Sequence, residues 1–329
     1  MKRALITGIN GFVGSHLAEL LLGLDYDIYG TTLLGTSSEN LKNAKDNVKL
    51  IPIDLRDREA VLKILKDVEP DCIFHLAAKS FVPDSWADPR DTFENNVFST
   101  INILEACRFV KNDPKIQMCG SSEEYGEVRE SEVPIKESSP LRPLSPYAVT
   151  KVAQDMLGLQ YHASYGLKTI RTRAFNHTGP RRPDFFATST FAKQLASIKL
   201  NLQEPFVYHG NLSTYRDFTD VRDVVRAYEL ALRKCKSGEV YNICSGEAYR
   251  IGDVLNILFD VSEVRASQKL DERRLRPSDP LILKGDCSKF MEATGWKREI
   301  PIEKTLSDLY DYWLDILSGT AVQKINVKN

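Results

Sequence analysis

The segment that most constrains the fold of this chain is a short apolar run followed by a glycine-rich turn, close to the first residue. Residues 3–7 (RALIT) have the composition of a buried strand, and residues 8–14 (GINGFVG) follow them directly. A stretch with helical periodicity comes next. In such a unit Gly8 permits the tight turn, Gly11 lets the backbone approach a phosphate, and Gly14 lets helix and strand pack closely. The spacing therefore predicts the cradle that holds the pyrophosphate of a dinucleotide at a helix N-terminus.

A second pattern lies in residues 145–151 (SPYAVTK). Tyr147 and Lys151 are four residues apart, so on a helix they share one face at a separation of ~6 Å. An ammonium that close would favour the phenolate and lower the pKa of Tyr147 from its ordinary value of ~10. Pro146 suits the first helical turn, where its missing N–H is no loss. The pair predicts a proton-transfer group for an alcohol or a ketone, which is half of a hydride-transfer site.

Composition limits the possible partners. The 329 residues include 44 basic and 45 acidic side chains, so a net charge of −1 points neither to nucleic acid nor to a membrane surface. No apolar run approaches the ~20 residues needed to cross a bilayer. The six cysteines show no CxxC pair and no Cys/His spacing typical of metal ligands, so we expect no disulfide and no metal. We expect a cytoplasmic protein without a nucleic-acid or membrane partner.

Strand and helix patterns alternate along the first half of the chain, as a doubly wound parallel sheet requires. Strands are expected near residues 3–7, 26–30, 48–52, 71–76, 115–120 and 168–174. Helices are expected near residues 12–23, 57–67, 88–110 and 145–165. After residues 179–183 (GPRRP) the alternation of strand and helix patterns ends. We expect helices at 186–200 and 217–234, followed by a strand at 239–244 that returns to the sheet. Residues 250–329 are expected to form a mixed, charged lobe.

These features resemble the extended branch of the short-chain dehydrogenase/reductase superfamily that acts on nucleotide sugars. The resemblance is based on the glycine turn, on residues 120–126 (GSSEEYG) and on Tyr147 with Lys151. It implies an α/β fold, with a Rossmann doubly wound parallel sheet and a smaller mixed α/β C-terminal substrate domain. The dinucleotide-binding domain would span residues 1–177, rejoined by about residues 216–245. Residues 178–329 would mainly form the sugar-nucleotide-binding domain.

The acid–base residues follow from the same resemblance. Ser121 stands where the superfamily keeps a catalytic Ser or Thr, whose hydroxyl would bind the substrate oxygen beside Tyr147. Ser121-Ser122-Glu123 is similar to the Thr-Ser-Glu triplet of GDP-mannose 4,6-dehydratases, in which the carboxylate removes the C5 proton of a 4-keto sugar. The catalytic residues would then be Ser121, Glu123, Tyr147 and Lys151. Glu124 is expected to be structural or to face solvent.

Residues 175–182 (FNHTGPRR) resemble a segment of the same family that contacts substrate and cofactor. The cofactor-binding residues would be Gly8, Asn10, Gly11, Phe12, Val13, Gly14, Thr32, Asp54, Leu55, Leu76, Ala77, Ala78, Tyr147, Lys151, His177 and Arg182. The substrate-binding residues would be Ser122, Asn176, Lys193, Arg216 and Arg276. The arginines among them suit phosphate oxygens because a guanidinium binds them in a bidentate fork.

The cofactor is expected to be NADP, with NAD as an alternative. An acidic side chain at the end of the second strand would hold the ribose hydroxyls of NAD and repel a 2′-phosphate. Residues 29–33 (YGTTL) contain no acidic residue there, and they also lack an adjacent arginine that would favour NADP. Both families that the chain resembles favour NADP.

Several functions remain open at this stage. Glu123 and the double arginine favour a dehydratase acting on a GDP-linked hexose. The loop after the second strand lacks the arginine-rich insertion of the dehydratases and favours a GDP-4-keto-6-deoxy-mannose reductase instead. A nucleotide-sugar 4-epimerase and a non-enzymatic NADP(H) sensor are further alternatives.

The helices at 88–110 and 145–165 bear apolar residues on more than one face. In the branch that the chain resembles, the equivalent pair of helices forms a four-helix bundle across a homodimer. We therefore expect a homodimer, with a tetramer as the other possibility.

Overall fold

The large parallel sheet of this protein is built around the glycine turn. The computed structural model describes residues 1–275 and 280–326, and seven of the described strands form one sheet in the order β10-β6-β5-β4-β1-β2-β3. All of its strand pairs are parallel. The strands are β1 (Arg3–Thr7), β2 (Asp27–Thr32), β3 (Lys49–Pro52), β4 (Cys72–His75), β5 (Lys115–Ser121), β6 (Lys168–Ala174) and β10 (Val240–Ile243). The predicted α/β fold class is confirmed, and so is the Rossmann sheet.

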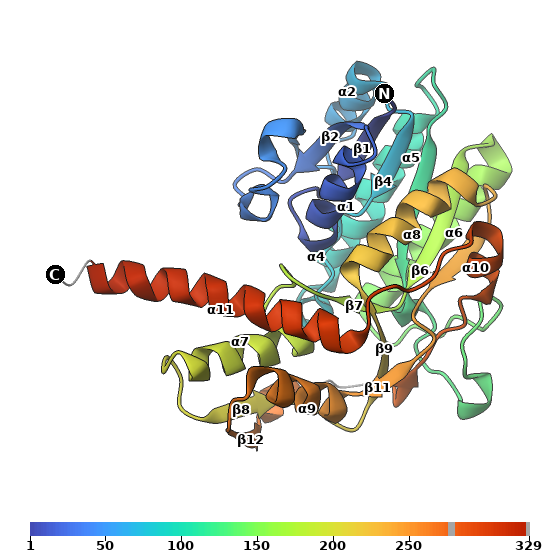
Figure 1. Cartoon of the computed structure of the whole chain (residues 1–329). Coiled ribbons are helices and arrows are strands. Elements are labelled where there is room, and N and C mark those ends of the chain that lie inside the picture. Colours follow the sequence, from blue (N-terminus) through green and yellow to red (C-terminus); the bar gives the residue numbers. More distant parts are fainter. Residues whose placement is uncertain (276–279, 327–329) are drawn as a thin grey trace.

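Helices cover both faces of this sheet (Figure 1). A layer of buried apolar side chains lies between the sheet and the helices on each face. Successive residues of a strand point to opposite faces, so Ile6 of β1 packs with α1 and α8 whereas Leu5 packs with α2 and α5. The helices around the sheet are α1 (Phe12–Leu22), α2 (Arg58–Val68), α4 (Pro89–Phe93), α5 (Ser99–Cys107), α6 (Pro146–Tyr165) and α8 (Val221–Lys234). The strand order reverses between β1 and β4, which opens a crevice at the carboxyl ends of the strands.

Two of the predicted helices differ from the structure. The helix expected at 88–110 is interrupted by a π-helical turn over Glu94–Phe98. This turn aims the buried Asn96 side chain at the loop after β4, where it binds Lys79 N and Lys79 O, and at Thr150 of α6. These partners are remote in sequence, so apolar periodicity gives no sign of the interruption.

The helix expected from residue 217 begins instead at Val221, because residues 215–220 form strand β9 (Tyr215–Asp220). The Asp220 carboxylate accepts the N–H of Arg222 and ends the strand as a helix cap. Strand β9 pairs with β7 (Asn176–Thr178), β11 (Ala248–Arg250) and β13 (Ile282–Leu283) in a second sheet. The helical periodicity of residues 221–234 therefore does not extend back to residue 217, and the predicted start of this helix is wrong.

The remaining residues form a smaller lobe (Figure 1). This lobe has its own apolar core. Its helices are α7 (Ala187–Lys199), α9 (Ile251–Ser262) and α11 (Ile302–Asn326), and β8 (Phe206–His209) pairs with β12 (Ser267–Leu270). Helix α3 (Val82–Ala87) and helix α10 (Ser288–Thr294) flank the large sheet region. Strand β10 lies at the edge of the large sheet, beside β6. The division of the chain into domains stays a prediction.

We predict that Gly14→Ala destabilises the protein by about 1–3 kcal/mol, as overpacking of a close contact does. A methyl group at position 14 would lie 2.4 Å from Gly8 O and 2.8 Å from Ile9 Cα, so helix α1 would have to move off β1. Thermal or urea unfolding measures the change. The control is Gly23→Ala at the other end of α1, where φ is −66° and the nearest atom lies 3.4 Å away. Equal stability of both variants would contradict the prediction.

Candidate active site

A cleft of about 360 Å³ lies at the carboxyl ends of β1, β4 and β5. Its floor is the glycine turn, in which Gly8 has a φ of +67° that favours glycine. A Cβ at Gly14 would lie 2.4 Å from Gly8 O, so the turn has no room for a side chain at that position. The cleft is lined by most of the predicted cofactor residues: Gly8, Asn10, Gly11, Phe12, Val13, Gly14, Leu76, Ala77, Ala78, Tyr147, Lys151, His177 and Arg182. This cradle fits a dinucleotide pyrophosphate.

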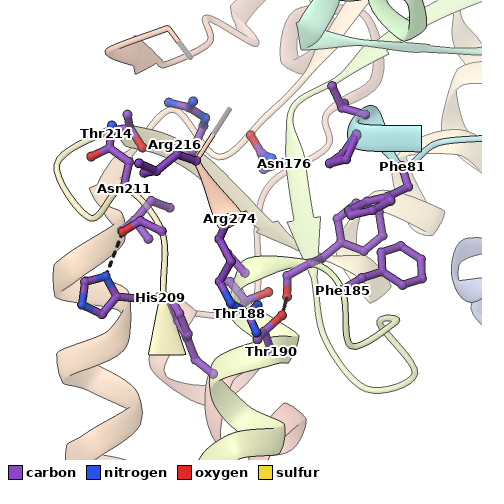
Figure 2. Close-up of a pocket in the computed structure, with 18 of the residues that line it drawn as sticks. Phe81, Asn176, Phe185, Thr188, Thr190, His209, Asn211, Thr214, Arg216 and Arg274 are labelled. Carbon is purple, nitrogen blue, oxygen red and sulfur yellow. Dashed lines mark hydrogen bonds between the residues drawn. The ribbon is translucent and has the colours of Figure 1, made fainter. Parts of the chain in front are cut away.

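A second cavity of about 570 Å³ adjoins the cleft on the side of the smaller lobe. Figure 2 shows Phe81 and Phe185 on one side of this cavity and Thr214 with Arg216 on the other. The two cavities share a junction that we define by the lining residues common to both: Val82, Asn176, His177, Arg182, Phe185 and Phe186. A ligand seated in the second cavity reaches Tyr147 through this junction.

Three of the predicted catalytic residues come together in the cleft from two elements. Ser121 ends β5, and Tyr147 and Lys151 lie in the first turns of α6. The Ser145 hydroxyl caps α6 by accepting the N–H of Ala148 at 3.1 Å, and Pro146 occupies the first turn as expected. The Ser121 hydroxyl is close enough to the phenol of Tyr147 to act on its pKa, so the two hydroxyl groups are neighbours. The hydroxyl pair that acid–base work on an alcohol or ketone requires is therefore assembled.

The protonation of Tyr147 differs from the prediction. Burial raises the pKa of Tyr147 above its usual value, and the nearby Ser121 hydroxyl opposes this only in part. Lys151 Nζ donates to Cys119 O at 2.7 Å and lies 5.9 Å from the centroid of the Tyr147 ring, and its own pKa is lowered by burial. The expectation that the ammonium lowers the phenol pKa is thus wrong for this arrangement. The phenol is protonated at neutral pH.

Glu123 lines the same cleft as Ser121 and Tyr147. Its backbone N–H donates to the Ser121 hydroxyl at 3.2 Å. Its negative charge is among the causes that raise the pKa of Tyr147, so the carboxylate and the phenol are electrostatic neighbours. A second acid–base group therefore stands within the same cleft as the phenol.

Two polar groups at the junction have room for a ligand. Asn176 Oδ1 is buried without a hydrogen-bond partner among the described residues, so it can accept a hydrogen bond from a ligand. The Arg182 guanidinium lies over the rings of Phe186 at 3.5 Å and Phe12 at 5.1 Å. Burial lowers the pKa of Arg182, but a guanidinium stays charged in proteins. In the described parts of the chain its side chain has no carboxylate partner, which suits it to a phosphate.

These observations agree with the comparison with known proteins. A family model described as GDP-mannose 4,6 dehydratase matches residues 5–309. The chain belongs to this family. The predicted membership of the nucleotide-sugar branch of the extended short-chain dehydrogenases/reductases is confirmed, as is the prediction of an enzyme.

The relatives of this GDP-mannose 4,6-dehydratase family member include both reaction types. The GDP-6-deoxy-D-mannose reductase of Pseudomonas aeruginosa is 31% identical over 316 residues, which cover 95% of this chain and 97% of the reductase. GDP-mannose 4,6 dehydratase 2 of Arabidopsis thaliana is 32% identical over 334 residues, which cover 96% of this chain and 87% of the dehydratase. The solved structure of RMD from Pseudomonas aeruginosa complexed with NADPH has a TM-score of 0.82 and 31% identity, and covers 96% of this chain and 100% of that chain.

Some predicted residues of this family member lie outside both cavities. Thr32 is buried in β2, and Leu55 is buried beside α2. The Asp54 carboxylate pairs with Arg56 at 2.6 Å. Lys193 on α7 pairs with Asp184 at 2.5 Å and lines neither cavity. The structure does not bring these four residues to the candidate site, and their roles stay predictions.

The remaining predicted substrate residues divide into three cases. Ser122 lines the cofactor cleft, and Arg216 lines the second cavity, where its guanidinium donates to Tyr215 O and Pro280 O. Arg276 lies outside the described residues. Arg274, which the sequence did not indicate, also lines the second cavity. Its position four residues from the end of β12 offered no signal beyond a basic cluster.

The aromatic residues of the site were also missed. Phe81 comes from the loop before α3, whereas Phe185 and Phe186 come from the segment before α7. The ring centroids of Phe81 and Phe185 are 4.5 Å apart, and those of Phe185 and Phe186 are 4.8 Å apart. The adjacent phenylalanines after residues 175–182 were the one available sign of this cluster.

We predict that Arg182→Met weakens binding of the pyridine dinucleotide about 10- to 100-fold, because a hydrogen bond to a charged group contributes about 1.5–3 kcal/mol. Methionine retains much of the apolar volume between Phe12 and Phe186, so the fold should be preserved. Isothermal titration calorimetry measures the affinity. Arg90→Met serves as the control, since the Arg90 side chain is 89% exposed and pairs only with Glu94 among the described residues. An unchanged affinity in Arg182→Met would refute this role.

Proposed function

We propose that this chain is a nucleotide-sugar 4,6-dehydratase that converts GDP-mannose to GDP-4-keto-6-deoxy-mannose with bound NADP. The observation that supports the dehydratase is the place of Glu123, whose carboxyl group lines the cleft together with Ser121 and Tyr147. A reductase or an epimerase needs one acid–base group at C4, whereas a dehydratase also needs a base for the C5 proton. Residues 1–177, rejoined by about 216–245, would form the dinucleotide-binding domain, and residues 178–329 would mainly form the sugar-nucleotide-binding domain.

The residues of the chain perform the proton transfers. Tyr147 accepts the proton of the C4 hydroxyl, and Ser121 holds that oxygen in place. Glu123 then removes the C5 proton, which the new C4 ketone makes acidic, and passes it to the C6 hydroxyl, which leaves as water. Addition of hydride at C6 would be matched by return of the proton held by Tyr147 to C5, so the net change is the loss of one water. The dinucleotide, when bound, supplies the hydride acceptor for C4 and the hydride donor for C6, and its oxidised ring adds the positive charge that favours the phenolate. Lys151, whose ammonium donates to Cys119 O, adds positive charge near the same phenolate.

The expected cofactor is NADP, with NAD as an alternative. Thr31 and Thr32 end β2, and neither is acidic, so a 2′-phosphate meets no like charge there. The solved relative from Pseudomonas aeruginosa is complexed with NADPH. Arg182 and the backbone of the glycine turn are the groups that would hold the pyrophosphate.

The second cavity would hold the GDP part of the substrate. Arg216 and Arg274 supply positive charge for a diphosphate, and the cavity opens onto the junction that leads to Tyr147. Asn176 would bind the sugar or its phosphates with its unsatisfied oxygen. A cytoplasmic location is proposed because the six cysteines are free thiols, as a reducing compartment requires.

A reductase acting on GDP-4-keto-6-deoxy-mannose is the second candidate. The chain covers 97% of the Pseudomonas reductase but 87% of the Arabidopsis dehydratase. After β2 the chain turns at Leu33–Thr36 into two short 3-10 helices, with no arginine-rich loop. In this case Tyr147 would donate its proton to the C4 ketone, and NADPH would be consumed.

We predict that the protein converts GDP-mannose, without added reductant, to a product lighter by one water. Glu123→Gln should lower kcat on the order of 100-fold or more, as loss of an acid–base group does. Mass spectrometry detects the product, and absorbance at the NADPH band should show no net change. The control is Glu127→Gln, which removes an exposed carboxylate of the same segment that lines neither cavity. Turnover of the keto sugar alone, with NADPH consumed, would support the reductase instead.

A homodimer is proposed from the outer faces of α5 and α6. Exposed apolar side chains gather on these helices and on their ends: Phe98, Phe109, Val149, Met156, Leu159 and Tyr165. Helix α6 packs against α5 and α4, so the faces are continuous. Two such pairs would bury each other as a four-helix bundle, and a tetramer would need a further contact.

The double substitution Met156→Glu/Leu159→Glu should convert this dimer to a monomer, because it places charge on an apolar interface. Both side chains are 39% exposed and lie three residues apart on α6. Light scattering after size-exclusion chromatography gives the molecular mass. Leu202→Glu, at an exposed position of the smaller lobe, should leave the mass unchanged. A monomeric unsubstituted protein would disprove the interface.

A further inference from the structure

Glu124 is completely buried beside the catalytic residues. It follows Glu123 in the 3-10 turn after β5 (Ser122–Glu124), and its exposed fraction is 0%. The alternative that it faces solvent is therefore wrong. A buried carboxyl group is costly unless its oxygens are satisfied, so its partners reveal its role.

One oxygen of Glu124 holds the backbone of Ser121. Glu124 Oε1 accepts the Ser121 N–H at 2.7 Å, while the Ser121 hydroxyl accepts the Glu123 N–H at 3.2 Å. This reciprocal pair fixes the backbone of Ser121 at the point where β5 enters the turn. The orientation of the Ser121 hydroxyl towards Tyr147 depends on that backbone.

The other oxygen has no hydrogen bond in the described part of the chain. Glu124 Oε2 lies 3.1 Å from Arg173 Nε, but Arg173 Nε donates its single hydrogen to Asp155 Oδ2 at 2.6 Å. Asp155 also receives Arg171 Nη1 at 2.5 Å and pairs with Arg173 Nη2 at 2.6 Å. Of the two neighbouring carboxyl groups, Asp155 therefore takes the guanidinium hydrogens.

A proton on Glu124 Oε2, donated to Asp155, would satisfy the orphaned atom. Burial and the negative charge of Asp155 both raise the pKa of Glu124 well above its usual value, and a hydrogen bond from the Glu124 proton to Asp155 would act in the same direction. The titratable and charged groups that face Glu124 are Arg173 on β6, Asp155, Lys151 and Tyr147 on α6, and Tyr125 beside it in the chain.

We propose that Glu124 is a positioning residue that stays protonated and joins Ser121 to helix α6 through a hydrogen bond to Asp155. Asp155 lies one helical turn after Lys151 and two turns after Tyr147. The connection Ser121–Glu124–Asp155 therefore sets the Ser121 hydroxyl relative to the phenol of Tyr147 through side chains that touch neither substrate nor cofactor. Its kinetic consequence rests on the proposed function; its protonation does not.

Two substitutions at Glu124 separate the hydrogen-bonding role of its side chain from a role of its negative charge. Glutamine in Glu124→Gln has an oxygen for Ser121 N–H and an N–H for Asp155, so it mimics the protonated acid. We expect Glu124→Gln to retain kcat within about threefold and Glu124→Ala to lose on the order of 100-fold in kcat with KM nearly unchanged, as expected for a misplaced reacting group. A loss in Glu124→Gln as large as in Glu124→Ala, or no loss in either, would overturn the proposal.

Infrared difference spectroscopy tests the proton directly, without turnover. The spectrum of the unsubstituted protein at pH 7 minus that of Glu124→Gln should contain the C=O band of a protonated carboxyl group. Asp217, which is also buried, is present in both proteins and cancels in the difference. Absence of the band would refute the protonated state even if GDP-mannose proves not to be the substrate, or if Glu124→Ala does not fold.

Discussion

The ion pairs of Asp155 with Arg171 and Arg173 determine where helix α6 lies on the large sheet, and the active site depends on that position. Arg171 and Arg173 alternate with Thr172 along β6, so both guanidinium groups point to the face that α6 covers. All three charged residues are buried. Removing one partner of such a cluster leaves an uncompensated charge, which typically costs about 3–5 kcal/mol. Tyr147 and Lys151 lie on the same helix, so their place above β5 follows from this contact.

Local patterns were enough to predict the strand–glycine turn–helix unit and to place Tyr147 and Lys151 on one helix. Gly8 has a positive φ, and a Cβ at Gly11 or Gly14 would meet atoms of the same strand–turn–helix unit. Tyr147 and Lys151 are separated by one helical turn. Neither pattern depends on distant parts of the chain. The lining of the cleft by these residues shows how far short-range spacing can predict a site.

Residues whose position depends on distant partners could not be predicted in this way. The π-turn at Asn96 exists because of Lys79 and Thr150, and the burial of Glu124 depends on Arg173 and Asp155. The spacing of Tyr147 and Lys151 likewise predicted the distance between the two side chains but not how deeply the phenol is buried. Because burial outweighs the ammonium, the direction of the phenol pKa was predicted wrongly.

The raised pKa of Tyr147 has a consequence for catalysis. A buried, protonated phenol can donate a proton but does not accept one until positive charge arrives beside it. The Lys151 ammonium donates one of its three hydrogens to Cys119 O, and Glu123 adds negative charge to the same cleft. The charge that makes Tyr147 a base must therefore come with a ligand. Proton removal by Tyr147 would thereby be coupled to occupancy of the cleft that it lines.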